Sequence, residues 1–471
     1  MINIKINDKE YSVEEGLTVL QAAEKVGVEI PRFCAHEYLK PEGLCRMCLV
    51  EIKGARKLQT SCTTPVKEGL EVWTETEAVV KAREEILKLH FANHPIDCPE
   101  CDQAGECSLQ EYYDKYGFYK NPYIIKKEKR EKDIELSDNL ILDRERCILC
   151  LRCVRFTEEI LGNKQLFVYE RGNKSYISTY EGEKISSDYS GNIAEICPVG
   201  AITDRNFRFK IRNWFLEKRE TICPLCNRGC NIYVETPKDK PYLKNYERFI
   251  RVKSRDNSKI NKSFICDTGR YKLKELEKRR NYKFIYNMKN VNWVRIKKIL
   301  LEHIVTLDTI ILSSWLTNGE IDLALSIFRE YLNIKDIFYW GRKEGEEDNI
   351  LIKKDKNPNT YYLKEKKVKN INDMSSNLSN ALIFGDFFED NPNIKKRMND
   401  DSFIIMVSPY LPRDIEKINL LLPVTNFFEK GGDWTNFEGI IQKTKPIFTP
   451  KEEIKTEFEI LQIIDSLLRK E

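Results

Sequence analysis

Residues 147–153 read Cys-Ile-Leu-Cys-Leu-Arg-Cys, and a Cys-Pro pair follows at residues 197–198. Thiols at so regular a spacing indicate metal ligands, because neighbouring thiolates can reach one metal centre. The chain of 471 residues has 15 Cys, all between Cys34 and Cys266. An odd number of cysteines, with no secretory signal at the N-terminus, favours ligands or catalytic thiols over disulfides.

The spacing C-x2-C-x2-C with a distant Cys-Pro is that of bacterial ferredoxins, which bind [4Fe–4S] clusters. A two-cluster ferredoxin would have a further Cys at position 157, which is Thr157 here. The positions that would complete its second ligand set are Ser187, Ser190 and Ile193. The pattern therefore predicts one surviving cluster and one lost cluster. The ligands of the surviving cluster would be Cys147, Cys150, Cys153 and Cys197.

The remaining cysteines form three more groups, and with one histidine they complete four sets of four donors without remainder. The set nearest the N-terminus, predicted to hold a [2Fe–2S] cluster, is Cys34, Cys45, Cys48 and Cys62. The next set, predicted to hold a [4Fe–4S] cluster, is His94, Cys98, Cys101 and Cys107. The last set, also predicted to hold a [4Fe–4S] cluster, is Cys223, Cys226, Cys230 and Cys266. Zinc is the alternative metal, because it accepts the same tetrahedral thiolate sets.

The position of His94 in the sequence makes it the predicted fourth ligand of the second set. His94 lies four residues before Cys98 and supplies the donor that this group lacks, while His90 and His36 are competing candidates. A neutral imidazole in place of a thiolate makes a cluster less negative, which should raise its reduction potential.

Both ends of the chain show patterns of regular secondary structure. Alternating isoleucines at residues 2–6, a turn and a return strand at 10–13 predict a hairpin, and Thr18 can cap a helix that ends at Gly27. The C-terminal region alternates expected helices at 294–304, 321–332 and 458–468 with expected strands at 309–312, 337–340, 381–384 and 403–407. This alternation predicts a small α/β unit with a mostly parallel sheet. The polar stretch 343–380 is expected to be an exposed or poorly ordered insertion.

The composition excludes several classes of protein. Lys and Arg number 78 against 74 Asp and Glu. The net charge of +4 is too small to indicate a surface that binds nucleic acid. No apolar run approaches the roughly 18 residues of a membrane span. Neither a GxGxxG nor a GxxxxGK[ST] motif is present, so nothing marks a nucleotide or flavin site.

These motifs resemble the large iron–sulfur subunit of NADH:quinone oxidoreductase (respiratory complex I), which is called the G-type or 75 kDa subunit. The resemblance rests on residues 43–51 (Gly-Leu-Cys-Arg-Met-Cys-Leu-Val-Glu), on residues 94–107 and on residues 197–201 (Cys-Pro-Val-Gly-Ala). It is strong over residues 1–275 and returns weakly at residues 422–423 and 429–439.

The resemblance implies a multidomain chain of α+β and α/β parts. The expected parts are a β-grasp [2Fe–2S] ferredoxin domain (1–78), a helical His-ligated [4Fe–4S] segment (79–118), a ferredoxin-like domain with one [4Fe–4S] cluster (119–215), a [4Fe–4S] molybdopterin-oxidoreductase-type domain (216–275) and a shortened molybdopterin-oxidoreductase-like α/β region (276–471). No molybdopterin is expected, because no Cys follows Cys266 and the last region is short for a pterin-binding body.

By the same resemblance, the chain relays single electrons and has no catalytic residue of its own. Its expected partners are a flavin- and NADH-binding subunit and a ferredoxin-like subunit of the quinone module, with membrane contact only through the complex. The expected location is the cytoplasmic face of a bacterial inner membrane, or the matrix side if the gene is organellar. The Cys223 cluster is expected to stand off the main electron path. Alternatives are an electron-transfer subunit of an NAD-linked or electron-bifurcating hydrogenase or a formate dehydrogenase, and a zinc-stapled scaffold.

Overall fold

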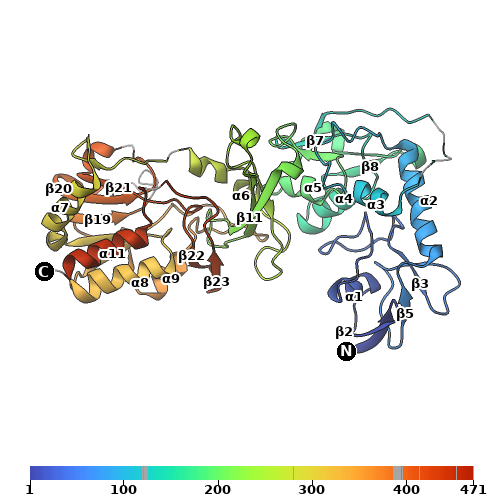
Figure 1. The fold of residues 1–471 in the computed structure, drawn as a ribbon, viewed down its shortest axis with the longest axis horizontal. Helices are drawn as coiled ribbons and strands as arrows, with labels where there is room; N and C mark the ends of the chain where they lie inside the picture. The colour runs from blue at the N-terminus through green and yellow to red at the C-terminus, as the bar shows by residue number, and fades with distance from the viewer. Residues whose placement is uncertain are drawn as a thin grey trace. The chain divides into compact units, whose positions relative to one another are not determined.

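The computed structural model describes residues 1–118, 120, 123, 126–278, 280–385, 394, 396–412, 414–451 and 453–469. The chain divides into two compact units, whose elements are labelled in Figure 1. The first is Met1–Glu217 with Pro237–Tyr246, and the second is Lys218–Thr236 with Glu247–Glu471. In the part of the chain that is described, no helix is both long enough and apolar enough to cross a membrane.

The first unit opens with a five-stranded sheet in the order β2-β1-β5-β3-β4. Its strands are β1 (Ile2–Ile6), β2 (Lys9–Val13), β3 (Leu49–Ile52), β4 (Gln59–Thr60) and β5 (Glu71–Trp73). Helix α1 (Val19–Lys25) begins at Thr18, whose hydroxyl accepts from the Gln21 amide, while the Gln21 side chain accepts from the Thr18 amide. Such a reciprocal cap satisfies two amides that the first helical turn leaves free. The predicted hairpin and helix are confirmed.

The rest of the first unit combines helices with short sheets. Its helices are α2 (Glu77–Asn93), α3 (Ser108–Tyr116), α4 (Arg152–Arg155), the π-turn η1 (Phe156–Ile160) and α5 (Gly191–Ile196). Its strands are β6 (Ile134–Glu135), β7 (Leu140–Leu142) and β10 (Ile202–Asp204) in one sheet, and β8 (Phe167–Tyr169) and β9 (Tyr176–Ser178) in another.

Three of the four positions at which a lost cluster is predicted are buried. Thr157 and Ile193 are fully buried, and Ser190 is nearly so. The Thr157 hydroxyl donates to the Val154 carbonyl at 2.8 Å and accepts from the Gln165 amide at 3.3 Å. A ligand position has thus become part of the local hydrogen bonding and core.

The second unit holds a three-stranded sheet, a large sheet and a two-stranded sheet of β22 (Gly432–Thr435) and β23 (Ile441–Thr444). The three-stranded sheet has the order β11-β12-β13, with β11 (Leu216–Ile222), β12 (Asn231–Pro237) and β13 (Arg251–Ser254), and the short helix α6 (Asp267–Tyr271) follows it. The large sheet has the order β15-β14-β21-β20-β19-β16-β17-β18. Its strands are β14 (Ile285–Tyr286), β15 (Lys289–Asn290), β16 (Thr309–Ser313), β17 (Asp336–Trp340), β18 (Lys369–Asn370), β19 (Leu378–Phe384), β20 (Met398–Ser408) and β21 (Leu420–Pro423).

The strands from β21 to β18 pair in parallel, and only β14 and β15 are antiparallel, so the predicted mostly parallel sheet is confirmed. The helices are α7 (Trp293–His303), α8 (Asn318–Leu325) with its π-turn η8 (Ser326–Tyr331), α9 (Thr360–Glu365) and α11 (Glu457–Leu468). Helices α8 and α11 pack against each other (Figure 1). Ile310 and Leu312 join their core, whereas Ile311 joins a separate core, because successive strand residues face opposite sides.

The expectation for residues 343–380 was wrong. This stretch contains α9 and β18, and it buries Leu351, Leu363, Ile371 and Met374. The stretch is polar on average, but apolar residues at wide intervals in it are buried. A buried asparagine also fixes it in place, because the Asn359 amide donates to the Leu316 carbonyl at 2.8 Å.

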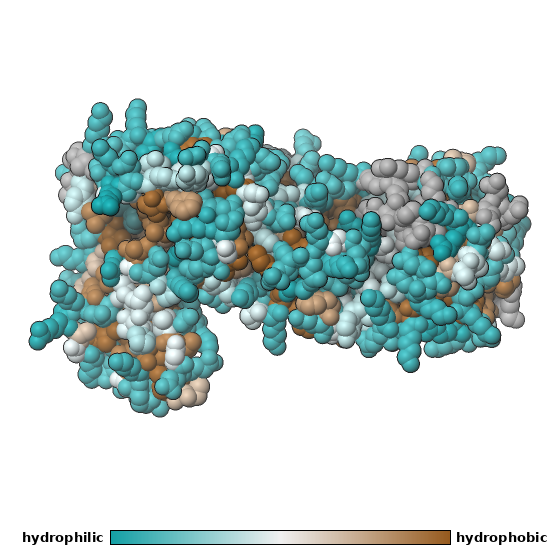
Figure 2. All heavy atoms as spheres, turned by 180° about the vertical axis from the view of Figure 1, so that it is seen from behind, coloured by the Kyte–Doolittle hydropathy of each residue, from teal (hydrophilic) through white to brown (hydrophobic). Residues whose placement is uncertain are grey.

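The surface matches the high content of charged residues, which is 32%. Figure 2 shows hydrophilic residues over most of the face in view, with smaller apolar areas between them.

Candidate metal centres

All 15 cysteines are free thiols, and each is either buried or partly buried. Within the described ranges, no three side chains of His, Cys, Asp or Glu converge closely enough to hold a single metal ion. The donors of the first set nevertheless meet in pairs, and those of the second line one cavity.

The first set lies in the loops of the N-terminal sheet domain. The sulfurs of Cys48 and Cys62 are 3.4 Å apart, and the Phe33 amide donates to the Cys45 sulfur at 3.4 Å. A hydrogen bond from Cys45 lowers the pKa of Cys34 to about 5, and one from Cys62 lowers the pKa of Cys48 to about 6. Each pair therefore favours one thiolate, which is the form that binds metal.

The second set surrounds a cavity of about 500 Å³. His94, Cys98, Cys101 and Cys107 all line it, together with Gly200 and apolar side chains such as Leu109. His94 directly follows helix α2, and its carbonyl accepts a hydrogen bond from the Lys127 ammonium at 2.6 Å.

His94 has the properties expected of a metal ligand. Its Nδ1 atom is buried and has no hydrogen-bond partner among the described residues. Burial lowers the pKa of His94 to about 4, so the ring is neutral at pH 7 and can donate an electron pair. His90 lies outside the lining of this cavity and packs edge-on against Phe33, with ring centroids 5.2 Å apart. His36 accepts from the Tyr38 amide at 3.3 Å and also lies outside the lining.

In the third set, Cys153 belongs to α4, Cys197 directly follows α5, and all members except the partly buried Cys147 are buried. Burial raises the pKa of Cys147 to about 11 and of Cys150 to about 12. Burial, and then the charges of Cys150, Cys147 and Cys197, raise the pKa of Cys153. Thiols in such surroundings need a nearby cation to become thiolates together.

Two contacts that the sequence analysis missed join the second and third sets. A Cβ atom at Gly200 would lie 2.1 Å from the Cys101 sulfur, so only glycine fits there. The Arg146 guanidinium binds both carboxylate oxygens of Asp97, through Nη2 at 2.7 Å and Nε at 3.1 Å. The only signal in the sequence was adjacency, because Asp97 precedes Cys98 and Arg146 precedes Cys147.

The fourth set lies in the second unit. The Cys223 amide donates to the Cys230 carbonyl at 2.8 Å, and the Gly269 amide donates to the Cys266 sulfur at 3.4 Å. Burial, and then the charges of Cys226, Cys223 and Cys266, raise the pKa of Cys230. That these four donors bind one cluster stays a prediction.

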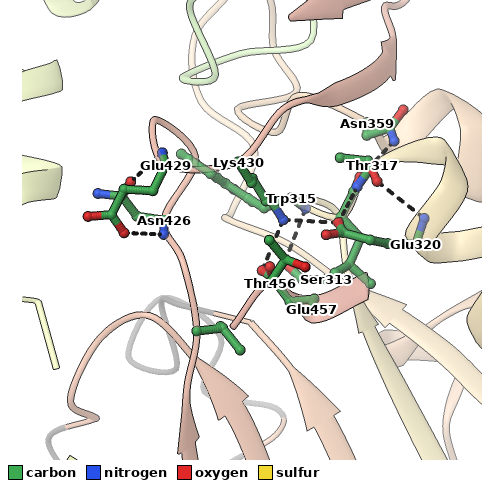
Figure 3. A network of polar contacts seen from close by, with 12 residues as sticks. Ser313, Trp315, Thr317, Glu320, Asn359, Asn426, Glu429, Lys430, Thr456 and Glu457 are labelled. Atoms are coloured by element: carbon green, nitrogen blue, oxygen red, sulfur yellow. Dashed lines mark hydrogen bonds and ion pairs between the residues drawn. The ribbon is translucent and has the colours of Figure 1, made fainter. Parts of the chain in front are cut away.

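A polar network fills part of the large sheet's carboxyl edge (Figure 3). The buried Lys430 ammonium pairs with Glu320 at 3.0 Å and with Glu457 at 2.9 Å. A cavity of about 10 Å³ lies beside them, with Ser313 and Trp315 in its lining. Ligands of open α/β sheets bind at this edge, but such a volume is about that of one water molecule. This cavity therefore does not fit a pterin.

The chain matches five family models in sequence order. Residues 1–77 match a 2Fe-2S iron-sulfur cluster binding domain, and residues 83–122 match the NADH-ubiquinone oxidoreductase-G iron-sulfur binding region. Residues 137–203 match the ferredoxin-like domain of NADH-quinone oxidoreductase subunit 3. Residues 216–278 match the molybdopterin oxidoreductase Fe4S4 domain, and residues 261–465 match molybdopterin oxidoreductase. The predicted combination of domains is confirmed.

Curated proteins with these domains are similar to the chain. The NADH-quinone oxidoreductase G-type subunit 2 of Rhizobium meliloti is 41% identical over 283 residues, which is 59% of this chain and 32% of the relative. The mitochondrial NADH-ubiquinone oxidoreductase 78 kDa subunit of Candida albicans is 39% identical over 280 residues, 59% of this chain and 38% of the relative. Subunit 3 of the NADH-quinone oxidoreductase of Thermus thermophilus is 36% identical over 305 residues, 58% of this chain and 38% of the relative. The match thus spans about a third of each relative.

Proposed function

Since the chain is a homologue of the large iron–sulfur subunits of NADH-quinone oxidoreductases over about three fifths of its length, we propose that it is a multi-cluster electron-transfer subunit of such an oxidoreductase. Clusters bound in its four ligand sets would take up and release single electrons. The sets would hold one [2Fe–2S] and three [4Fe–4S] clusters, in the order given by the family models.

The observation that carries this proposal is the cavity around the second set. Three cysteines and a neutral histidine face one space, and the histidine nitrogen there has no other partner among the described residues. A buried polar atom without a partner is costly, so a metal that accepts its lone pair would relieve that cost. This supports His94, rather than His90, as the fourth ligand.

The residues between the second and third sets support a path through both. Gly200 lets the backbone after Cys197 approach the Cys101 sulfur closely. The Asp97–Arg146 ion pair holds the two ligand loops together beside that contact. Side chains larger than glycine would push the loops apart and lengthen the path.

The partners that we propose are a flavin- and NADH-binding subunit, which would supply electrons, and a ferredoxin-like subunit, which would pass them toward quinone. The place that we propose is the peripheral arm of a membrane-bound complex, on the cytoplasmic face of a bacterial membrane. We propose that the C-terminal region binds no molybdopterin, because Lys430 and its carboxylate partners occupy part of the ligand edge.

The test compares two cysteine variants in the assembled complex. Cys150→Ala should remove one [4Fe–4S] EPR signal and block NADH-to-quinone electron transfer, because the third set lies on the proposed path. Cys226→Ala is the matched control, which should remove a different signal and leave electron transfer in place. Normal turnover in the Cys150→Ala complex, with its signal demonstrably absent, would refute the proposed path.

A further inference from the structure

Arg152 touches the segments of two different ligand sets. It lies between Cys150 and Cys153, on helix α4. Its Nη2 donates to the Ala35 carbonyl at 2.6 Å, and its Nη1 donates to the Ile196 carbonyl at 3.2 Å. Ala35 follows Cys34, and Ile196 precedes Cys197. One guanidinium therefore joins a loop of the first set to both segments of the third.

Arg155, one turn further along the same helix, adds to this connection. It is buried, and its guanidinium donates to the carbonyls of Cys34 and Lys40. The first and third sets are thus held together by charged donors on one helix, and both arginines bind backbone oxygens beside Cys34.

The charge of Arg152 has no carboxylate counterpart among the described residues. Its Nε atom is buried and has no hydrogen-bond partner there. A guanidinium keeps its charge in proteins and has five N–H donors. A partly buried cation with an unused donor is costly unless negative charge lies nearby. The residues that its guanidinium contacts adjoin Cys34 and Cys197, so cluster charge in either set would lie near it.

We propose that Arg152 is a positioning residue that locks the first and third ligand sets to each other and raises the reduction potentials of the clusters in both. This inference rests on the proposed function, because it requires clusters in both sets. A fixed positive charge stabilises the reduced, more negative form of a cluster, and the two backbone contacts fix that charge between the sets.

The experiment is an EPR-monitored redox titration of the cluster-loaded complex. Arg152→Gln should lower the midpoint potentials of both signals. We expect the equilibrium constant for reduction to fall about tenfold, which is about 59 mV for a one-electron couple. Arg152→Lys keeps the charge but not the planar fork, so both potentials should lie between those of the wild type and Arg152→Gln.

Arg144→Gln is the matched control. Arg144 belongs to the same domain, and its guanidinium binds Glu131, Ser178 and the Ile177 carbonyl, none of which belongs to a ligand loop. Both potentials should be unchanged in this variant.

The possible outcomes distinguish a failure of the proposed role of Arg152 from a failure of the proposed function. Loss of both EPR signals in Arg152→Gln, with both retained in Arg152→Lys, would also support the proposed role of Arg152. One side chain would then be needed for the clusters in both sets. Unchanged potentials, a change confined to one signal, or an equal change in Arg144→Gln would overturn that role. If the unaltered complex lacks either signal, the proposed function fails instead.

Discussion

His94 is the one predicted ligand in the four sets that is not a cysteine, so the second set would offer an imidazole in place of one thiolate. Its lowered pKa makes the ring neutral at pH 7, and its buried Nδ1 atom has no partner among the described residues. The charge of a bound cluster would therefore be one unit less negative than with four thiolates. That difference should appear in the reduction potential.

We expect His94→Cys to retain a cluster and to lower its reduction potential, because a thiolate adds negative charge. His90→Gln serves as the control, since His90 packs against Phe33 outside the cavity lining. An EPR redox titration measures both variants. A potential that is unchanged in His94→Cys but shifted in His90→Gln would make His90 the ligand.

Gly200 lies where a Cβ atom would collide with a predicted cluster ligand. In Gly200→Ala the new methyl group would meet the Cys101 sulfur at 2.1 Å, so the ligand loop must move. We expect the EPR signal of the His-ligated cluster to be lost or broadened. Gly319→Ala is the control, because no atom lies within 4 Å of a Cβ atom there. An unaltered signal in Gly200→Ala would show that the two loops are not in close contact.

At the scale of elements, the residues at the starts of two helices arrange the polar network at the carboxyl edge of the large sheet. Thr317 caps α8 and Thr456 caps α11, each in a capping box that is closed by a glutamate, Glu320 or Glu459. These caps hold the helices over the sheet and place Glu320 and Glu457 beside Lys430. The carboxyl edge of the sheet is therefore organised by helix starts.

Glu457 should make the stability of this region depend on pH. Burial raises the pKa of Glu457 from its ordinary value of 4.5 to about 7, against the opposing charge of Lys430. The folded protein then holds a proton that the unfolded chain releases between these values, so the free energy of unfolding falls as pH rises from about 4.5 to 7. We expect Glu457→Gln to flatten that fall.

Urea unfolding of the second unit, followed by tryptophan fluorescence at several pH values, measures this effect. Trp315, Trp340 and Trp434 are buried there and report on the unit. Glu453→Gln is the control, since Glu453 is exposed. An identical pH dependence in Glu457→Gln and the wild type would mean that Glu457 is ionised in the folded protein throughout this range.

At the scale of the whole molecule, the sequence was enough for the order of domains and for the main secondary structure. Cysteine spacing carries that information because ligands of one set lie mostly in one short loop. The alternation of helices with strands in the C-terminal region was likewise visible. The grouping of donors into sets and the identity of the bound metal both stay predictions.

The features that the sequence could not predict depend on contacts between distant segments. Arg152 meets Ala35, Arg146 meets Asp97, and Gly200 meets Cys101 only in the folded chain. The stretch 343–380 was misjudged for a related reason, because its few apolar residues are buried by neighbours far away in sequence. Composition averages over a window and does not show which single side chains find such neighbours.

The metal content of the anaerobically purified chain tests the central claim most directly. Iron, acid-labile sulfide and zinc should be measured on the same sample, together with the EPR spectrum after reduction. One [2Fe–2S] and three [4Fe–4S] clusters require about 14 iron atoms and about 14 sulfides per chain, with little zinc. A colourless protein that holds about four zinc atoms and gives no EPR signal would contradict the account.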